Sequence, residues 1–505
     1  MKLELKGISK QFPGVLANDD VHLSVAEGEI VALLGENGAG KTTLMNILYG
    51  LYRPTSGEVL INDEPLIMSS PGDAIAAGIG MVHQHFMLVP VFTVAENVIL
   101  GDEPTKQAGW LDIASARKTV REISGRYSLD VDPDALIEDL PVGIQQRVEI
   151  IKVLAREAKF LVFDEPTSVL TPTEVDGFVE IVNGLKADGK GIIFISHKLG
   201  EALEIADRIV IMRRGRTVAE VLPSDVDEEK LAELMVGRPV DLRVHKEEAQ
   251  PADVVLSVEQ LVVLNDRNHR AVDGLSFEVR AGEIVGIAGV QGNGQTELVE
   301  SLTGMRPSLG GIVRLSGEDV TTDSPRSIHK RNVAHVPEDR QKSGLVLSFT
   351  VTENIVLDSY YEAPVSQGIR MNWSAAEERA LRLVEEYDVR TPGVDVAVST
   401  LSGGNQQKVI VAREFDRDVA LVIASQPTRG IDVGSIEYIH SRIVEERDNN
   451  AAVLIVSSEL DEITALADRI LVLYEGKIAG EFDPSASTTE IGLAMLGSQG
   501  EVDAT

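Results

Sequence analysis

The chain contains no cysteine, has few positive charges relative to negative ones, and carries no long apolar run. Without cysteine it can form neither disulfide bonds nor thiolate metal sites. No run approaches the roughly 20 apolar residues that a membrane-spanning helix requires. The N-terminal residues MKLELKGISK also lack the apolar stretch of a secretory signal. The lack of an apolar span and of a secretory signal predicts a protein of the cytoplasm.

The charge balance excludes one class of partner. The 47 lysine and arginine residues are outnumbered by 80 aspartate and glutamate residues, which gives a formal net charge of -33. A surface of that sign repels the phosphate backbone of DNA or RNA, so we expect no nucleic-acid ligand. At 505 residues with 43% hydrophobic content, the chain is long enough for two or more globular domains.

The sequence repeats itself at long range. AEGEIVALLGENGAGKTTL near the N-terminus is answered by AGEIVGIAGVQGNGQTEL, and TVAENVILG returns as TVTENIVLD. Gly35 corresponds to Gly289, an offset of 289 minus 35, or 254 residues. A period this long indicates a duplicated domain rather than a solenoid. The expected parts are a first domain at 1–240, a polar linker at 241–253, a second domain at 254–498 and a tail at 499–505.

Each copy alternates short apolar runs with helical patterns. EIVALLG, FLVFDEP and GIIFISH are rich in Val, Ile, Leu and Phe without alternation, which is typical of strands covered on both faces of a mostly parallel sheet. Amphipathic patterns predict helices over 114–127 and 375–387. The expected fold class is α/β, with two tandem domains that each combine a mostly parallel sheet, an antiparallel β part and a helical insertion.

One loop carries a complete phosphate-binding motif. GENGAGKT, at Gly35–Thr42, fits G-x-x-x-x-G-K-[ST] and lies between an apolar strand and a helical run. Its glycines let backbone N–H groups close around phosphates at a helix N-terminus. We expect Lys41 to reach the β and γ phosphates and the Thr42 hydroxyl to bind Mg²⁺. The loop alone leaves a GTPase, a kinase and a helicase open.

A second motif supplies acidic groups. KFLVFDEPTS ends an apolar strand in two carboxylates. Asp164 suits a water-mediated hold on Mg²⁺, and Glu165 suits the base that polarises an attacking water. Two buried neighbouring carboxylates would be unfavourable without a cation, which argues for a site. His197 follows the next apolar run and is placed to contact the γ phosphate.

Together these motifs resemble the ATP-binding-cassette ATPases, over nearly the whole chain. The resemblance implies ATP and Mg²⁺ as ligands, and an α/β phosphate-loop domain in each copy. The residues that it assigns to catalysis are Glu165, His197 and Gln84, the last at the Q-loop position in MVHQHF. The residues that it assigns to Mg²⁺ are Thr42, Gln84 and Asp164. The residues that it assigns to the nucleotide are Phe12 (stacked on adenine), Gly35, Asn37, Gly38, Gly40, Lys41, Thr42, Thr43, Ser402, Gly403 and Gly404.

More narrowly, two fused cassettes resemble the ATPase subunits of simple-sugar and nucleoside importers. HQHFMLVPVFTVAENVILG and LPVGIQQRVEI are most similar to the nucleoside branch. This implies two integral-membrane permease subunits as partners, an extracytoplasmic substrate-binding protein as an indirect partner, and a peripheral position on the cytoplasmic face of the cell membrane. The resemblance also implies that TVAENVIL and TVTENIVL lie where short permease helices bind; the alternative is an ordinary helix in each subdomain.

The second copy departs from the family pattern at the catalytic positions. In place of the lysine, the Q-loop glutamine, the two acids and the histidine stand Gln295, Glu338, Ser425, Gln426 and Ser458. Loss of a general base alone typically lowers a rate by about 10² to 10⁴. We expect no hydrolysis at this loop, although its glycines leave nucleotide binding open.

The signature motif of the resembled family is altered in the first copy rather than in the second. LSGGN at 401–405 is nearly intact in the second copy, whereas LPVGI in the first copy has Pro141 and Val142 in place of the serine and a glycine. Cassettes of the resembled family pair head to tail, with the signature loop of one over the phosphate loop of the other. The pairing predicts one catalytic composite site, which joins the first phosphate loop to Ser402, and one noncatalytic site.

Other functions stay as alternatives. A twin-cassette ATPase that acts on ribosomes or another macromolecule needs no permease, but typically keeps both sites competent and has a longer charged linker. A DNA-repair cassette ATPase would carry zinc-binding cysteines or a basic surface, and this chain has neither. A binding-only scaffold is excluded only to the extent that Glu165 is catalytic.

Overall fold

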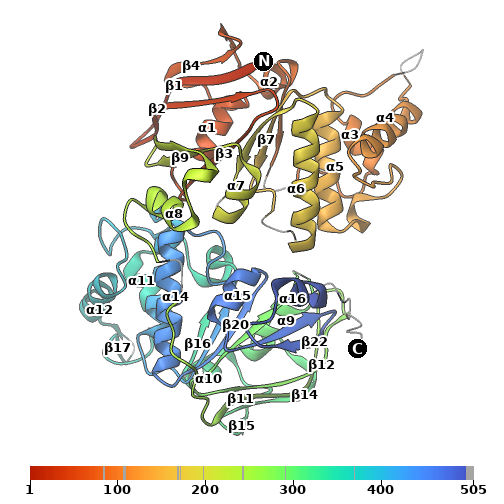
Figure 1. Cartoon of the computed structure of the whole chain (residues 1–505). Coiled ribbons are helices and arrows are strands. Elements are labelled where there is room, and N and C mark those ends of the chain that lie inside the picture. The colour runs from red at the N-terminus through yellow and green to blue at the C-terminus, as the bar shows by residue number, and fades with distance from the viewer. Residues whose placement is uncertain are drawn as a thin grey trace. The chain divides into compact units, whose positions relative to one another are not determined.

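The computed structural model describes residues 1–83, 86–105, 110–167, 170, 172–196, 198–241, 244–290, 292–368, 370–495 and 497. The chain divides into two compact units, Met1–Val240 and Asp241–Thr505. In each, an antiparallel sheet accompanies a larger, mostly parallel sheet with helices around it (Figure 1). Among the described residues, every helix is too short or too polar to cross a lipid bilayer.

The described part of the first unit contains two sheets. The antiparallel sheet has the order β2 (Val15–Ala26), β1 (Lys2–Phe12), β4 (Ser56–Ile61), β5 (Glu64–Pro65). The larger sheet has the order β10 (Arg216–Val221), β9 (Arg208–Arg213), β3 (Ile30–Gly35), β8 (Gly191–Ile195), β7 (Phe160–Asp164), β6 (Ile79–Val82). Only β10 runs antiparallel to its neighbour, through a hairpin at Gly215.

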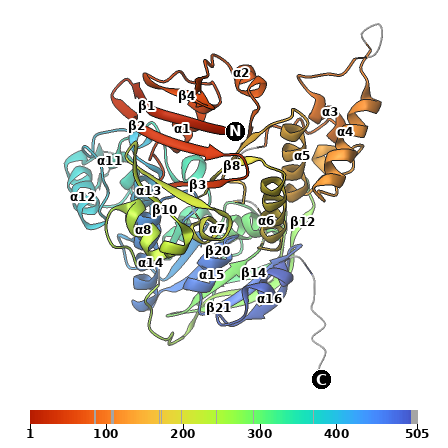
Figure 2. The same cartoon turned by 45° about the horizontal axis from the view of Figure 1, so that its top comes forward.

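Some helices cover this larger sheet, and others form a separate group beside it. They are α1 (Lys41–Leu48), α2 (Pro71–Ala76), α3 (Val94–Ile99), α4 (Ile113–Arg126), α5 (Val142–Leu154), α6 (Pro172–Ala187), α7 (Leu199–Ile205) and α8 (Glu228–Val236), with 3₁₀ turns at Ile137–Asp139 and Pro223–Asp225. Figures 1 and 2 show α3, α4 and α5 together at one side of the unit, away from β1 and β2.

Burial on both faces explains the unbroken apolar runs of the central strands. All six residues of β3 are buried. One core cluster packs Val31 and Leu33 with the antiparallel sheet and α1, and another packs Ile30 with α5 and α6. A strand between two such cores has no solvent face, so its sequence shows no polar alternation.

The second unit repeats both sheets in its described residues. The antiparallel sheet has the order β12 (Arg270–Arg280), β11 (Val254–Leu264), β14 (Ser308–Leu315), β15 (Glu318–Asp319). The larger sheet has the order β16 (Val333–Val336), β19 (Leu421–Ser425), β20 (Ala452–Ser457), β13 (Ile284–Ala288), β21 (Arg469–Tyr474), β22 (Lys477–Phe482). A small hairpin joins β17 (Ser366–Gln367) to β18 (Arg370–Met371).

The helices of the second unit also follow the first. They are α9 (Gln295–Leu302), α10 (Pro325–His329), α11 (Val351–Ile355), α12 (Trp373–Glu386), α13 (Gly403–Phe415), α14 (Val433–Asp448), α15 (Leu460–Leu466) and α16 (Thr488–Met495), with a π-helical turn at Arg340–Gly344 and a 3₁₀ turn at Val398–Thr400. The predicted α/β fold class is confirmed in both units.

The two helices predicted from amphipathic patterns are present, with starts one or two residues earlier than expected. Helix α4 begins at Ile113 because the Asp112 side chain accepts a hydrogen bond from the Ser115 backbone N–H. Helix α12 begins at Trp373 because Asn372 caps it in the same way. Caps of this kind fix a helix start that apolar periodicity cannot locate.

The segment predicted as a linker is attached to the second unit where it is described. The Lys246 ammonium donates to the carbonyl oxygens of Leu466 and Ala467 and forms an ion pair with Asp468 at 2.7 Å. The Ala252 backbone N–H donates to the Ala281 carbonyl at 2.9 Å. These contacts hold the middle of the segment and its C-terminal end to the body that follows it.

The repeated TVxEN segments have a local structural role. Thr93 caps α3, and the Glu96 carboxylate accepts hydrogen bonds from the Thr93 backbone N–H and hydroxyl, both at 2.8 Å. Thr350 and Glu353 form the same capping box at α11. A reciprocal cap of this kind satisfies backbone N–H groups that the first turn of a helix leaves unpaired.

The asparagine of each segment clamps the preceding loop. The buried Asn97 side chain accepts from the Val89 backbone N–H at 2.7 Å and donates to the Val89 carbonyl at 3.1 Å. Asn354 makes both bonds with Val346, at 2.9 and 3.1 Å. The repetition of TVxEN is therefore explained by helix capping and loop fixation.

We predict that Asn97→Ala destabilises the first unit. The change removes both hydrogen bonds to Val89 and should lower the free energy of unfolding by about 1–3 kcal/mol. Denaturant unfolding of the full chain measures this as an earlier first transition. Lys118→Ala, on an ion-paired but largely exposed side chain of α4, serves as the control and should stay within about 0.5 kcal/mol. Equal stability of the two variants would contradict the clamp.

Candidate functional site

The first phosphate loop connects the buried end of β3 to the N-terminus of α1. Gly40, the N-cap residue, has φ of 99°. A Cβ atom at Gly40 would lie 2.4 Å from the Ala17 carbonyl oxygen and 2.7 Å from the Asn18 amide nitrogen, so only glycine fits. Asn18 itself donates to the Gly40 carbonyl at 3.1 Å. The loop is therefore fastened to β2 as well as to its own helix.

Lys41 lies inside this loop. Its side chain is buried, and its ammonium donates to the carbonyl oxygens of Gly35 and Glu36. Burial lowers the pKa of the Lys41 ammonium, while the carboxylates of Glu165, Asp164 and Glu36 act in the opposite direction. The ammonium thus lies where the loop closes, as expected of a group that meets phosphate oxygens.

The two acids predicted from the sequence stand at the end of β7. Burial, followed by the neighbouring Glu165 carboxylate, raises the pKa of Asp164 to about 6, and Lys41 acts against this rise. Glu165 takes a left-handed backbone with φ of 48°, and its N–H donates to the Ile195 carbonyl at 2.9 Å. This places the acid pair in electrostatic range of the loop lysine, at the same edge of one sheet, with β8 between β7 and β3.

The other residues predicted for the first-unit site differ in their exposure. Asn37, Gly38 and Thr42 are exposed, and Thr43 is half-buried in the first turn of α1. Phe12 is half-buried at the end of β1 and contacts Tyr52 edge to face, with ring centroids 5.6 Å apart. Gln84 and His197 lie outside the described residues.

Glu201 and Tyr52 of the first unit, and Glu462 of the second, were not predicted from the sequence. The Glu201 carboxylate accepts from the Thr167 hydroxyl at 2.7 Å and from the Ser196 hydroxyl at 3.1 Å, which joins the loops after β7 and β8. Glu462 accepts from Thr428 at 2.6 Å in the second unit. The repeat, at an offset of 462 minus 201, or 261, was the available signal. Tyr52, beside Phe12, has no counterpart in the repeat, where Arg306 stands.

The second phosphate loop keeps the backbone of the first. Gly294 has φ of 101°, and a Cβ there would lie 2.1 Å from the Ala271 carbonyl oxygen. Gln295 is buried and its amide donates to the Gly289 carbonyl at 3.2 Å, the counterpart of the Lys41 bond to Gly35. Gln426 has φ of 47°, close to that of Glu165, and its N–H donates to the Val456 carbonyl at 2.7 Å.

The polar groups around this loop bind one another. The Thr296 hydroxyl donates to Glu338 at 3.2 Å, and Glu338 forms an ion pair with Arg429 at 2.6 Å. The Ser458 hydroxyl donates to the Gln426 side-chain oxygen at 3.3 Å. Neutral amides and hydroxyls thus replace the lysine, the acids and the histidine of the first copy without loss of the fold.

The two signature segments differ in their helix caps. Ser402 caps α13: its exposed hydroxyl accepts from the Asn405 backbone N–H at 3.5 Å and from the Asn405 side-chain amide at 2.8 Å. Gly404 has no space for a side chain, since a Cβ would lie 2.1 Å from the Ser435 hydroxyl oxygen. In the first unit Pro141 stands at the N-cap of α5 without a side-chain cap bond. The residues Ser402, Gly403 and Gly404 therefore form a helix N-terminus with a side-chain cap, whereas α5 of the first copy begins without one.

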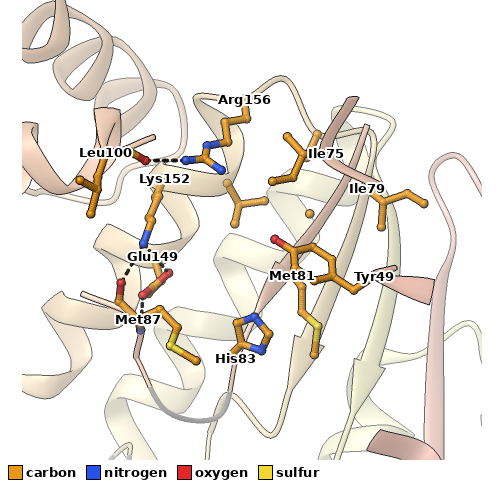
Figure 3. Close-up of a pocket in the computed structure, with 13 residues that line it drawn as sticks. Tyr49, Ile75, Ile79, Met81, His83, Met87, Leu100, Glu149, Lys152 and Arg156 are labelled. Atoms are coloured by element: carbon orange, nitrogen blue, oxygen red, sulfur yellow. Dashed lines mark hydrogen bonds and ion pairs between the residues drawn. The ribbon is translucent and has the colours of Figure 1, made fainter. Parts of the chain in front are cut away.

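A pocket of about 290 Å³ lies in the first unit between α5, β6 and the segment that follows α3. We call it the first-unit pocket. Figure 3 shows Tyr49, Met81 and His83 facing Glu149 and Lys152 across it. Glu149 accepts from the Met87 backbone N–H at 2.6 Å, and Lys152 donates to the Met87 carbonyl at 2.9 Å. The pocket thus adjoins the segment around the Q-loop position.

Comparisons with known proteins identify the fold and the family. A family model described as ABC transporter matches residues 18–168 and 272–429, one match in each unit. A solved structure of RNase-L Inhibitor, 21% identical, covers 97% of this chain and 93% of its own, with a TM-score of 0.63. At that identity the likeness shows the twin-domain fold alone.

Relatives of higher identity span the chain. It is 51% identical over 496 residues to the nucleoside import ATP-binding protein NupA of Lactococcus lactis, with 98% of each chain covered. It is 49% identical to the guanosine import ATP-binding protein NupO of Bacillus subtilis, over 98% of this chain and 97% of that one. It is 44% identical to the glucose import ATP-binding protein TsgD13 of Haloferax volcanii, over 100% and 97%.

These matches confirm the resemblance inferred from the motifs. Both units carry the family's phosphate-loop fold, and relatives near half identity extend over nearly the full length. The chain therefore belongs to the ABC transporter family, as an ATP-hydrolysing subunit with two ATP-binding cassettes.

Proposed function

We propose that the chain powers nucleoside import through a membrane permease by hydrolysing ATP at one composite site. The first phosphate loop with Glu165 forms one half of this site, and the Ser402 helix N-terminus forms the other. One observation carries the proposal. The buried lysine and acids belong to the first unit, whereas the capped signature helix belongs to the second. Head-to-tail pairing of the units would join the first phosphate loop to the Ser402 helix, and the second phosphate loop to the Pro141 helix.

The first-unit residues suit the chemistry of phosphate hydrolysis. An entering γ phosphate would take over the Lys41 hydrogen bonds now made to the loop carbonyls. The Thr42 hydroxyl and the Asp164 carboxylate are hard oxygen donors that fit Mg²⁺, and Gln84 would complete the set. Bound Mg²⁺ neutralises charge on the β and γ phosphates. Glu165 orients the attacking water and accepts its proton, and His197 would contact the γ phosphate.

The second half of the composite site supplies hydrogen-bond donors. The Ser402 hydroxyl and the N–H groups of Gly403 and Gly404 lie at the N-terminus of α13, whose dipole favours anions. The other composite site would combine Gln295, Gln426 and Pro141, none of which provides a cation or a general base. Hydrolysis is therefore assigned to one site, and Phe12 to the adenine ring there.

The transported substrate is proposed from the relatives. The first two name nucleosides or guanosine and the third names glucose, so nucleosides are favoured over sugars. The partners would be two permease subunits, with an extracytoplasmic binding protein acting through them, and the chain would lie at the cytoplasmic face of the membrane. Leu100, at the end of the TVAENVIL segment, lines the first-unit pocket, which makes this pocket the proposed permease contact.

We predict that Glu165→Gln abolishes turnover while MgATP binding persists. The amide keeps the side-chain shape but accepts no proton, so the ATPase rate should fall about 10²-fold or more. Uptake of labelled guanosine by cells that carry the assembled transporter should fall in parallel. Gln426→Glu, the reverse change at the matched position, should restore nothing. A Glu165→Gln rate within about twofold of the original would show that Glu165 is not the base.

We predict that MgATP binding weakens below about pH 6. Because the pKa of Asp164 is raised to about 6, this carboxyl is protonated below that pH and then competes poorly for Mg²⁺. The apparent Kd should rise by up to about tenfold per pH unit below that value and stay flat above pH 7. Asp164→Asn should bind weakly and lose this dependence. Subtracting the Asp164→Asn profile from that of the original chain removes the contribution of the titration of ATP itself. Parallel profiles would contradict the assignment of Asp164 to Mg²⁺.

We predict opposite outcomes for two signature variants. Ser402→Arg places a bulky side chain where the nucleotide must be enclosed and should abolish hydrolysis, with first-unit ATP binding retained. Pro141→Ser repairs a half site whose other half still lacks the lysine and should change turnover little. Steady-state ATPase activity of the assembled transporter measures both. Strong activation by Pro141→Ser with normal activity of Ser402→Arg would overturn the head-to-tail pairing.

A further inference from the structure

Two aromatic rings meet beside the first phosphate loop. Phe12 ends β1 and Tyr52 follows α1, and their ring centroids are 5.6 Å apart in an edge-to-face arrangement. The Lys10 ammonium lies 5.1 Å from the Phe12 centroid and 5.7 Å from that of Tyr52, and it donates to the Arg53 carbonyl at 2.8 Å. These three distances form a nearly equilateral triangle, so Lys10 and Tyr52 approach Phe12 from the same side. Another planar group would therefore meet the opposite side of the half-buried Phe12 ring.

Both rings belong to elements that are fastened to the phosphate loop. Lys10 pairs in register with Asn18 of β2, and the Asn18 amide donates to the Gly40 carbonyl at 3.1 Å. Helix α1 begins inside the loop, and the Tyr52 backbone N–H donates to the Asn46 carbonyl of this helix at 3.1 Å. The rings are thus held in a fixed place relative to the loop, as joint recognition of the phosphates and the base of one ligand requires.

The two rings keep much of their surface exposed. Tyr52 is 40% exposed and the neighbouring Leu51 is 51% exposed, while Phe12 is half-buried. Apolar groups stabilise a fold in proportion to the area that they remove from water, so rings this exposed contribute only part of what they could. A planar ligand that covers them would supply the rest.

The second unit has an ion pair at the same place. Arg306 stands at the position of Tyr52, 254 residues on (306 minus 52), and its backbone N–H donates to the Glu300 carbonyl at 3.0 Å in the same helix-to-turn bond. The Arg306 guanidinium pairs with Asp266 at 2.9 Å and with Glu300 at 2.6 Å. Asp266 lies in the segment after β11 that corresponds to the Phe12 turn. The backbone of the turn is therefore repeated, while the contact across it changes from aromatic to ionic.

This exchange separates what the fold requires from what a ligand requires. Either contact holds the β hairpin to the turn after the helix, so folding alone does not demand the rings. An ion pair supplies charge and hydrogen bonds, whereas aromatic rings supply the apolar face on which a nucleobase stacks. The rings occur in the unit that keeps Lys41 and Glu165, and the ion pair occurs where Gln295 and Gln426 replace them. The stacking surface and the catalytic residues thus lie in the same copy.

We infer that Tyr52 is a positioning residue for base recognition: together with Lys10 it fixes the Phe12 ring against the nucleobase of the bound nucleotide. The inference rests on the proposed function, which assigns ATP to the first phosphate loop and Phe12 to the adenine ring. Tyr52 acts through Phe12 and has no part in holding the phosphates, which the loop and Lys41 bind. Without Tyr52 the Phe12 ring is free to turn, so stacking weakens while phosphate binding persists.

A double-mutant cycle tests whether Tyr52 acts through Phe12. Tyr52→Ala should weaken MgATP binding to the full chain about 3- to 10-fold, the range expected for an edge-to-face aromatic pair. Phe12→Ala should weaken it about tenfold or more, because the stacking surface itself is lost. The double variant should bind no more weakly than Phe12→Ala alone. Multiplication of the two losses, or unchanged affinity of Tyr52→Ala, would overturn the inference.

Inorganic tripolyphosphate separates the phosphates from the base, because it has the phosphate chain of ATP and no ring. Tyr52→Ala should leave its affinity in the presence of Mg²⁺, measured by titration calorimetry, within about twofold of the original. In the assembled transporter the same variant should raise the KM for ATP and leave kcat unchanged. Equal losses for ATP and tripolyphosphate would assign Tyr52 to the structure of the loop, contrary to the inference. Failure of tripolyphosphate to bind the original chain would refute separate recognition of base and phosphates.

Three further variants sharpen the result. Tyr52→Phe keeps the ring and should restore the ATP affinity that Tyr52→Ala loses. Leu51→Ala shortens the neighbouring exposed side chain and should change the affinity for neither ligand; a loss as large as that of Tyr52→Ala would show that the turn matters rather than the ring. Lys41→Ala tests the proposed function itself. Unchanged MgATP binding by Lys41→Ala would refute ATP binding at the first phosphate loop, whereas the contrary outcomes for Tyr52 refute only its role in base recognition.

Discussion

The buried ammonium of Lys41 is the constraint around which the first unit is organised. It is desolvated at the base of the phosphate loop, held by two loop carbonyls and drawn by the carboxylates of Asp164 and Glu165. A buried cation is tolerable only with such partners. The two carboxylates come from the end of β7, far along the chain. The parallel sheet brings β3 and β7 to one edge, and this makes the charge arrangement possible.

The second unit shows what this arrangement requires of the fold. Gln295 occupies the lysine position and bonds to the equivalent carbonyl, and Gln426 keeps the left-handed backbone of Glu165. The scaffold thus depends on the hydrogen bond and the backbone angle, not on the charges. The second loop is thus held in place without the charges of the first.

The sequence predicted the parts of the structure that local pattern controls. The α/β fold, the buried strands and the family followed from apolar runs and from GENGAGKT and FLVFDEP. Contacts between distant residues escaped, such as Glu201 with Thr167, because only the folded sheet brings those loops together. The permease contact that the resemblance implies for TVAENVIL and TVTENIVL stays a prediction, and the structure adds that the threonine, glutamate and asparagine of these segments cap a helix and clamp a loop. A motif that recurs in both copies can record a requirement of the scaffold as well as one of a partner.

The pockets of the two units, the first-unit pocket and its counterpart between α10, β16 and α13, give the opposite case. They occupy equivalent places, but different side chains line them. Ile75 and Met81 give way to His329 and His335 while the strand pairing beneath them is unchanged. Scaffold requirements cannot distinguish equivalent positions of one fold, because the packing demand is the same in both. Where a duplicated scaffold keeps identical residues, folding explains them. Where it exchanges apolar for polar side chains at matched positions, as at His329 and His335, the shared fold alone does not account for them.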